Sequence, residues 1–168
     1  RVMDIDYWGV VHGTKAFLPY LIASGDGHVV NVSSAFGLFA VPGQAAYNSA
    51  KFAVRGFTEA LNQELTLARQ PVRVSTVFPG GVPSAFVNNL TLAEALPEFD
   101  AASTFDKPLW STSPEKAAQV ILKGVRKKRS RILVGPDTKL LDFLVRMTGS
   151  GYQFVVPRVG RLFMKPIR

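Results

Sequence analysis

A tyrosine and a lysine stand four places apart in the stretch AAYNSAK, residues 45–51. In a helix, residues with this spacing lie on the same face, with Cβ atoms about 5–6 Å apart. A cation about 4 Å from a phenol, at an effective dielectric of about 20, stabilises the phenolate by roughly 4 kcal/mol. At about 1.36 kcal/mol per unit, this would bring the pKa of Tyr47 from about 10 to near 7. Tyr47 and Lys51 therefore predict a site that exchanges a proton.

The motif YxxxK is common by chance, and alone it also fits a core tyrosine beside a solvated lysine. Ser34 favours the chemical interpretation, because it lies thirteen residues before Tyr47 at the expected carboxyl end of a strand, where α/β sheets place their sites. Its hydroxyl can hydrogen-bond a carbonyl oxygen that Tyr47 protonates. The segment FPGGVPS, residues 78–84, closes a second strand, and its glycines let the backbone approach a flat ligand closely. The three segments together predict one site at the edge of a sheet.

The elements that must position these residues alternate along the chain. Apolar residues at helical spacing predict helices over 3–24, 45–68, 113–127 and 137–147. Runs rich in β-branched residues predict strands over 27–34, 72–79 and 130–135. Strands that alternate with helices indicate parallel pairing through right-handed crossovers, which is an α/β fold. Because a parallel sheet of three strands leaves an apolar edge unpaired, we expect further strands before Arg1.

The segments NVSS, YNSAK and PGGVPS together resemble the short-chain dehydrogenase/reductase family, over residues 1–135. The resemblance implies a partial doubly wound Rossmann-type parallel sheet, and hydride transfer between NAD or NADP and an alcohol or carbonyl substrate. It makes Ser34 the substrate-orienting serine, Tyr47 the acid/base, and Lys51 the lysine that binds the nicotinamide ribose and lowers the tyrosine pKa. Tyr47 and Lys51 thereby also belong to the cofactor site. The segment that lines the nicotinamide corresponds to Pro79, Gly80, Val82 and Ser84, with serine where threonine is usual.

Two features depart from the family pattern. The family's fourth catalytic position, an asparagine that holds a proton-relay water, corresponds to Asp6 in MDIDYWG. A carboxylate can hold the water, but its charge works against a low tyrosine pKa. The glycine-rich turn that seats a pyrophosphate on a helix N-terminus has no counterpart, since the GxG in TGSGY, residues 148–152, follows a helix. We therefore expect little dehydrogenase activity from the isolated chain.

Composition narrows the class of protein. The 168 residues are 47% hydrophobic and 19% charged, which is typical of a globular domain with its own core. The chain has no Cys and two separated histidines, His12 and His28, so no zinc or other metal site is expected. No uncharged apolar run reaches the roughly 18 residues of a transmembrane helix. We expect a cytoplasmic protein, with a catalytic domain over 1–135 and a basic, partly apolar extension over 136–168.

The net charge of +8 is concentrated near the C-terminus. Residues 123–168 hold twelve Lys and Arg against two acids, a net charge of +10. The run KGVRKKRSR, residues 123–131, fits either contact with phosphates or a solvated helix end whose cations complement the helix dipole. The helix end is favoured because the run lacks interleaved aromatic residues, so nucleic acid binding is not expected.

The last segment, residues 152–168, mixes aromatic and aliphatic residues with Arg158, Arg161 and Lys165. It can lie on an anionic membrane surface or pack against the domain. Packing is favoured, because Pro157 is expected to interrupt a helix. The membrane alternative describes a non-catalytic binding or scaffold protein on the same fold, with a basic membrane- or phosphate-binding tail. A serine hydrolase is excluded, since Ser34 lacks a G-x-S-x-G elbow.

The resemblance also implies a homo-oligomer that assembles through the helices at 5–24 and 45–68. Scattered large apolar residues over 86–110 favour a hydrophobic small-molecule substrate, although a loop of this length also needs such residues to stay ordered.

Overall fold

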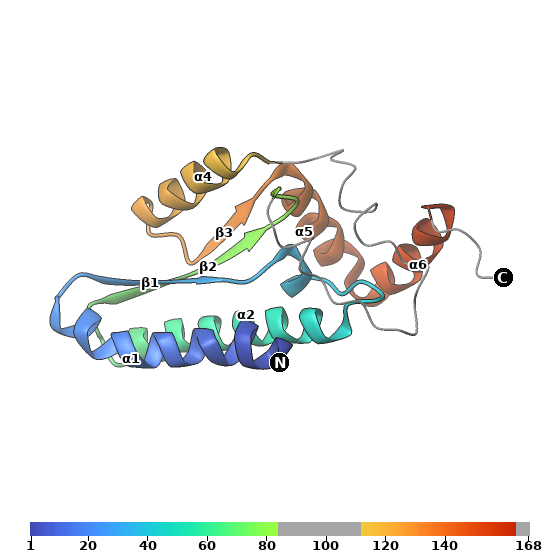
Figure 1. Ribbon diagram of the computed structural model, residues 1–168. Coiled ribbons are helices and arrows are strands. Elements are labelled where there is room, and N and C mark those ends of the chain that lie inside the picture. The colour runs from blue at the N-terminus through green and yellow to red at the C-terminus, as the bar shows by residue number, and fades with distance from the viewer. Residues whose placement is uncertain (84–111, 164–168) are drawn as a thin grey trace.

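A parallel sheet of three strands forms the centre of the molecule. The computed structural model describes residues 1–83 and 112–163, with side chains as far as residue 158. The strands are β1 (Gly27–Val32), β2 (Val72–Pro79) and β3 (Arg131–Val134), in the order β1-β2-β3 (Figure 1). Val32 pairs with Val77 and Pro79 with Val134, so the three strands end at the same edge. The expected parallel α/β architecture is confirmed.

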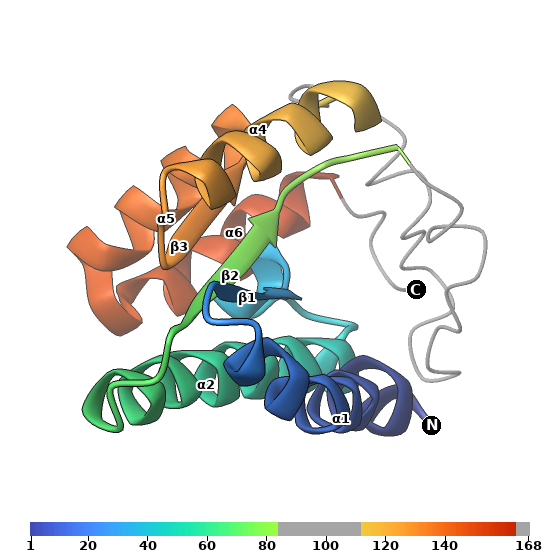
Figure 2. The ribbon, with the colours of Figure 1, turned by 90° about the vertical axis from the view of Figure 1, so that its left-hand side faces the viewer.

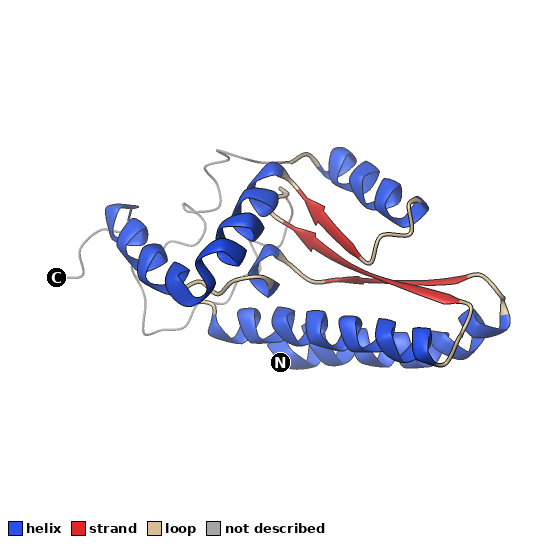
Figure 3. Ribbon diagram, turned by 180° about the vertical axis from the view of Figure 1, so that it is seen from behind, coloured by secondary structure: helices blue, strands red, loops and turns tan. Residues whose placement is uncertain are grey.

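Helices cover both faces of this sheet. A π-helical turn (Asp4–Trp8) leads into α1 (Gly9–Ala23), and α2 (Ala45–Leu67) connects β1 to β2. Figure 2 shows α1 and α2 on one side of the sheet and α4 (Pro114–Arg126) on the other. Figure 3 shows α1 and α2 running side by side beneath the strands. The chain then continues through α5 (Pro136–Thr148), a 3₁₀ turn (Gly149–Gly151) and α6 (Tyr152–Phe163).

The core follows from the alternation of side chains along β2. Val74 packs with Leu61 and Leu65 of α2, and Leu18 and Leu21 of α1 cover this cluster. Val77 and Phe78, further along the strand, lie on opposite faces of the sheet, because successive side chains of a strand point in opposite directions. Val77 packs with Ala117 of α4 and with Ile132 and Val134 of β3, whereas Phe78 packs with Ala35, Leu38 and Phe39. The apolar faces of the helices are therefore held against a fully covered strand.

The C-terminal segment is packed onto the same core where it begins. Leu141 and Val145 of α5, together with Tyr152 at the start of α6, lie against the cluster of Phe39 and Phe78. The Tyr152 hydroxyl accepts a hydrogen bond from the Ala40 backbone N–H at 3.3 Å. At Tyr152 this agrees with the expectation that residues 152–168 pack against the domain.

The expectation that Pro157 interrupts a helix is wrong. α6 runs from Tyr152 to Phe163 with Pro157 inside it. A proline in a helix lacks one donor to the preceding turn. Here the Arg158 guanidinium donates to the Phe154 carbonyl oxygen at 2.7 Å, which gives that turn a side-chain hydrogen bond. In the described part of the chain, no helix has the length and apolar character needed to span a membrane.

Candidate active site

Ser34 stands directly beyond the carboxyl end of β1. Its backbone is extended, with φ −158° and ψ 165°, and it caps the 3₁₀ turn Ala35–Gly37. The Ser34 hydroxyl oxygen accepts a hydrogen bond from the Phe36 backbone N–H at 3.2 Å, and the side chain also hydrogen-bonds the Tyr47 phenol. The sharp change from strand to turn thus presents the hydroxyl at the edge of the sheet, next to the predicted acid/base.

Tyr47 and Lys51 occupy neighbouring turns of α2, as the four-residue spacing predicts. The Lys51 ammonium lies 5.5 Å from the centroid of the Tyr47 ring. The Lys51 side chain is only 11% exposed, so its charge is held in a largely dry environment. The phenol ring also packs edge-on against Phe36, with centroids 6.3 Å apart.

Asp6 completes the group from a different element. It belongs to the π-helical turn before α1, and its Oδ1 lies 2.9 Å from the Lys51 ammonium nitrogen. The side chain of Asp6 is 27% exposed, so the ion pair reaches the surface on the carboxylate side. Four of the predicted site residues, Asp6, Ser34, Tyr47 and Lys51, therefore form one connected set of contacts.

The pKa of Tyr47 is raised above its ordinary value of 10.0. Burial is the largest cause, because it disfavours the phenolate; the hydrogen bond from Ser34 lowers the pKa, and the negative charge of Asp6 raises it. The expected lowering by Lys51 is therefore wrong for the chain by itself. Burial of the phenol is the main reason, and the negative charge of Asp6, which lies 2.9 Å from the Lys51 ammonium, acts in the same direction.

Buried polar side chains fix the helix against the strand. The Ser33 hydroxyl donates to the Lys51 carbonyl oxygen at 2.8 Å. The Asn31 amide donates to the Thr58 hydroxyl at 3.1 Å and accepts from the Thr14 hydroxyl at 3.4 Å, which ties β1 to both α2 and α1. These contacts set the rotation and height of α2, and with them the positions of Tyr47 and Lys51.

The end of β2 brings a second segment to the same edge. The Ser33 backbone N–H donates to the Val77 carbonyl oxygen at 2.8 Å, and Pro79 and Gly80 follow two and three residues later. Val82 packs beside the cluster formed by Val77 and its neighbours. Ser84 and the apolar segment 86–110 lie outside the described residues.

The packing of α5 requires a glycine at position 80, which the sequence motif alone did not indicate. A side chain there would collide with the Asp137 carboxylate and the Thr138 hydroxyl in the first turn of α5. The same carboxylate accepts a hydrogen bond from the Gly81 backbone N–H at 2.7 Å. The segment after β2 is therefore positioned by α5, which no local pattern in the sequence indicated.

The family model described as short chain dehydrogenase matches residues 1–95. The chain belongs to the short-chain dehydrogenase family. The match covers more than half of the 168 residues and includes the strand, turn and helix that carry the site.

Named relatives agree with the family assignment. The SadH protein of Mycobacterium tuberculosis, which is named as an oxidoreductase, is 56% identical over 156 residues, which are 93% of this chain and 56% of SadH. A Dictyostelium discoideum protein named 3-ketodihydrosphingosine reductase is 36% identical over 150 residues, 86% of this chain and 42% of that protein. The chain thus spans about half the length of the curated relatives it matches.

Solved structures share the fold of this short-chain dehydrogenase. A Burkholderia phymatum member, solved in complex with NAD, aligns with a TM-score of 0.73 and 24% identity, over 87% of this chain and 56% of that one. A Burkholderia cenocepacia member, solved in complex with NADP, aligns with a TM-score of 0.68 and 22% identity, over 93% and 58% of the two chains. The sheet and helices described above are therefore a short-chain dehydrogenase arrangement.

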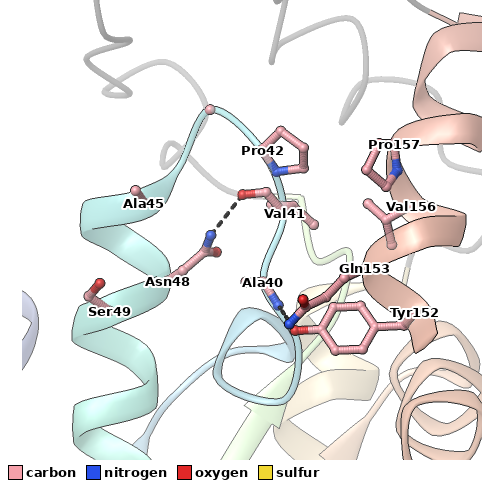
Figure 4. A pocket seen from close by; sticks show the side chains of 11 residues that line it. Ala40, Val41, Pro42, Ala45, Asn48, Ser49, Tyr152, Gln153, Val156 and Pro157 are labelled. Carbon is pink, nitrogen blue, oxygen red and sulfur yellow. Dashed lines mark hydrogen bonds between the residues drawn. The ribbon is translucent and has the colours of Figure 1, made fainter. Parts of the chain in front are cut away.

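A cavity of about 440 Å³ lies between the start of α2 and α6 (Figure 4). Its walls are mainly apolar, and they come from the loop of Ala40 to Gly43, from the first turns of α2, and from Tyr152, Val156 and Pro157 of α6. The Asn48 amide donates to the Val41 carbonyl oxygen at 2.8 Å on one side of the cavity. The Asn48 side-chain oxygen is buried without a hydrogen-bond partner. The contribution of Tyr152 and α6 was missed at the sequence level, because α6 and this loop are about a hundred residues apart.

Neither histidine enters the site. His28 opens β1 and shares a 2.7 Å hydrogen bond with the Ser75 hydroxyl, and His12 stacks on Trp8 of the first helix. The described residues contain no group of three or more acidic or histidine side chains that could hold a metal ion.

Proposed function

We propose that this chain carries the acid–base machinery of an oxidoreductase that uses NAD or NADP to interconvert an alcohol and a carbonyl compound. The observation that supports this function best is the Ser34–Tyr47 hydrogen bond at the carboxyl edge of the sheet, beside the Lys51–Asp6 ion pair. Two proteins of the same fold were solved with NAD and with NADP, which supports a nicotinamide cofactor here.

In the reductive direction, the Tyr47 hydroxyl donates its proton to the oxygen of a bound carbonyl group. Ser34 donates a hydrogen bond to the same oxygen and so fixes it within reach of the phenol. The nicotinamide, when bound, supplies the hydride that reaches the carbonyl carbon. In the oxidative direction, Tyr47 takes the proton of the alcohol. Its raised pKa keeps the phenol protonated near neutral pH, which suits the reductive direction.

The residues around the nicotinamide end of the cofactor fit this assignment. Lys51 has three N–H donors, and its ion pair with Asp6 leaves capacity for a ribose hydroxyl. Pro79 ends β2, and Gly80 and Val82 follow it at the same edge of the sheet as Ser34. We assign Tyr47, Lys51, Pro79, Gly80 and Val82 to the cofactor site, together with Ser84.

The proposed role of Asp6 is to hold Lys51 in place and to bind the water through which the proton reaches solvent. Its carboxylate is paired on one oxygen and 27% exposed, so it connects the buried lysine to the surface. Unlike the family's asparagine, it also adds a negative charge near the phenol, which disfavours the phenolate.

The substrate we propose is an apolar alcohol or ketone. The walls of the cavity beside α2 and α6 are mainly apolar, and the Dictyostelium discoideum relative is named a 3-ketodihydrosphingosine reductase. The buried Asn48 oxygen could accept one hydrogen bond from such a ligand.

Binding and turnover need separate tests. The 168-residue sequence has no glycine-rich turn between a strand and a helix, so the pyrophosphate would be weakly held and ketone-dependent NAD(P)H oxidation by this chain should be slow. Nicotinamide mononucleotide avoids that requirement. Titrating it into isotope-labelled protein should shift the amide NMR signals of Tyr47, Lys51 and Gly80.

Two variants connect binding to the proposed roles. Tyr47→Phe should keep the mononucleotide shifts and lose all residual turnover, whereas Lys51→Ala should lose the shifts as well. Shifts confined to residues far from the edge of the sheet, or full turnover by Tyr47→Phe, would refute the function.

A further inference from the structure

The outward face of α5 carries a stripe of large apolar side chains. Leu140, Phe143, Leu144 and Met147 recur at i, i+3, i+4 and i+7, which is the spacing of one helical face. Their exposed fractions are 50%, 59%, 44% and 70%. Soluble proteins often expose single apolar residues, but a contiguous row of this kind marks an interaction surface. We call these four residues the α5 stripe.

The opposite face of α5 is fixed to the protein, so the stripe cannot rotate inward. Leu141 and Val145 pack into the cluster around Phe78. Asp142 is held by the guanidinium groups of both Arg131 and Arg146. α5 thus has two apolar faces. One packs into the core, and the other is exposed to solvent.

Positive charge surrounds the stripe. The exposed charged side chains of α5 and of the part of α6 whose side chains are described are Lys139, Arg146 and Arg158, all cations. The two acids of α5 are both engaged, Asp137 by the Gly81 N–H and Asp142 by two arginines. Residues 123–168 as a whole carry a net charge of +10.

We propose that the α5 stripe docks this protein on the surface of a membrane that contains anionic lipids. The four side chains would enter the boundary between headgroups and acyl chains, while the neighbouring cations contact lipid phosphates. α6 also exposes apolar side chains near a cation, since Phe154 and Val155 are 67% and 54% exposed and Arg158 lies one turn further along the helix. Figures 1 and 3 show α6 projecting beyond the sheet.

The charge pattern favours lipid over a second copy of the chain. In a symmetric dimer the same patch meets itself. The stripes of two copies would bring the Lys139 side chains toward one another, and the described part of α5 and α6 offers no exposed acid to pair with them; Arg146 is already paired with Asp142. An anionic lipid surface satisfies both the apolar row and its cations.

Co-sedimentation of the 168-residue chain with vesicles tests the proposal. Vesicles of phosphatidylcholine with about 30% phosphatidylglycerol should bind the protein at low ionic strength, and pure phosphatidylcholine should bind at least tenfold less. High salt should weaken the binding, because the headgroup contacts are screened.

Two double variants separate the apolar and the charged contributions. Phe143→Gln with Met147→Gln should reduce the partition coefficient at least tenfold, since both side chains are lost from the stripe. Lys139→Gln with Arg158→Gln should reduce it about fivefold per cation, which corresponds to about 1 kcal/mol each. Phe143, Met147 and Lys139 are exposed, so their substitution should leave the melting temperature close to that of the parent protein; Arg158→Gln also removes the hydrogen bond to the Phe154 carbonyl oxygen and should lower it slightly.

Matched variants elsewhere provide the control. Leu67→Gln with Leu122→Gln removes two exposed apolar side chains from α2 and α4, and Lys15→Gln with Lys116→Gln removes two exposed cations. Both should bind vesicles like the parent. Equal losses in test and control pairs would mean that net charge or total hydrophobicity acts without a docking surface, and would overturn the proposal.

Three further results would also overturn it. The first is an absence of vesicle binding at low salt. The second is binding that the α5 substitutions leave unchanged. The third is a lipid-free dimer that Phe143→Gln with Met147→Gln dissociates in sedimentation velocity, since the α5 stripe would then be a subunit interface. Because none of these readouts involves hydride transfer, they are independent of the proposed enzymatic function.

Discussion

The pKa of Tyr47 is controlled by a balance that the YxxxK spacing alone does not reveal. The lysine is where the spacing puts it, 5.5 Å from the phenol ring. Its charge is nevertheless matched by Asp6 at 2.9 Å, and burial of the phenol raises the pKa further. The carboxylate of Asp6 therefore acts on the Tyr47 pKa in the opposite sense to that expected of Lys51, and in the same sense as burial.

Asp6→Asn should lower the pKa of Tyr47. The substitution removes the negative charge that raises this pKa and frees the Lys51 ammonium to stabilise the phenolate. A pH titration of tyrosine labelled with ¹³C at Cζ, with the Tyr47 signal assigned by Tyr47→Phe, measures the change directly.

Asp4→Asn is the matched control, because Asp4 belongs to the same π-helical turn but pairs with the chain's terminal ammonium at 3.1 Å and is 76% exposed. Its titration curve for Tyr47 should follow that of the parent. An unchanged or higher Tyr47 pKa in Asp6→Asn would show that Asp6 does not govern the acid/base.

Protonation of His28 should change the free energy of unfolding as the pH falls. Burial and the neighbouring Arg73 lower the pKa of His28 below its ordinary value of 6.5, against a smaller opposite effect from Asp26. The unfolded chain therefore takes up a proton first as the pH falls. The free energy of unfolding should decrease as the pH falls from about 6.5 through the folded pKa, and this loss should level off below it.

Urea unfolding at a series of pH values, for the parent and for His28→Gln, isolates this contribution. The difference between the two proteins should change between neutral and mildly acid pH and be constant above pH 7.5 or so. A constant difference over the whole range would mean that His28 does not titrate on folding.

At the scale of elements, the sequence predicted most of what the structure shows. The strand at 72–79 and the helix beginning at residue 45 were placed correctly, because β-branched runs and helix formers mark them clearly. Ser113 caps α4, with its hydroxyl oxygen 3.3 Å from the Lys116 backbone N–H. Strand runs, helix starts and helix caps depend on residues that are neighbours in the sequence, so sequence patterns predict them.

What the sequence did not predict depends on contacts between distant segments. Tyr152, at the start of the helix that contains Pro157, is held by Ala40, more than a hundred residues away. The collision that keeps Gly80 free of a side chain comes from α5, more than fifty residues away. The Lys51 ammonium is paired by Asp6, which belongs to the turn before α1. Neither propensity nor spacing contains such information.

Gly37 lies where three parts of the site converge, and Gly37→Ala should destabilise the protein by about 1–3 kcal/mol. A methyl group there would collide with the Ser33 hydroxyl and approach the Lys51 carbonyl oxygen to 2.8 Å. It would thereby disturb the hydrogen bond that fixes α2 to β1. Equilibrium unfolding in urea measures the loss.

Gly56→Ala provides the contrast within the same region of the chain. Gly56 lies in α2, and nothing stands within 4 Å of the position of an added methyl group. Alanine there should stabilise the helix by about 0.5–1 kcal/mol. Equal effects of the two substitutions would contradict the assignment of Gly37 as a packing constraint.

At the scale of the whole molecule, charge and apolar surface are divided between two regions. The first 122 residues hold eight Lys and Arg against ten acids, a net charge of −2, while residues 123–168 carry +10. The apolar surface of the N-terminal helices therefore lies in a nearly neutral region, and that of α5 in a strongly basic one. The nearly neutral surface of the N-terminal helices suits contact with another protein subunit. The basic surface around α5 suits contact with an anionic surface.

The outer face of α1 should accordingly mediate self-association. Phe17 and Tyr20 of α1 are exposed at 67% and 74%, and Ile5 and Trp8 of the preceding π-helical turn are exposed as well. On α2, Phe52 and Leu67 are exposed as well. Stable dimers bury about 1,600 Å² in total, which two paired helices per subunit can supply. Phe17→Glu with Tyr20→Glu should convert a dimer or larger oligomer to monomer in sedimentation velocity, because burying unpaired carboxylates at the interface is costly.

Leu122→Glu, on α4, carries the same kind of change away from α1 and should leave the oligomer intact. If the α1 variant stays associated, assembly does not use this face. If α1 does form the interface, α5 remains free in the oligomer, and each assembly presents several α5 stripes together. Vesicle binding should then be stronger for the oligomer than for the α1 variant at equal subunit concentration, because linked sites bind with higher effective concentration.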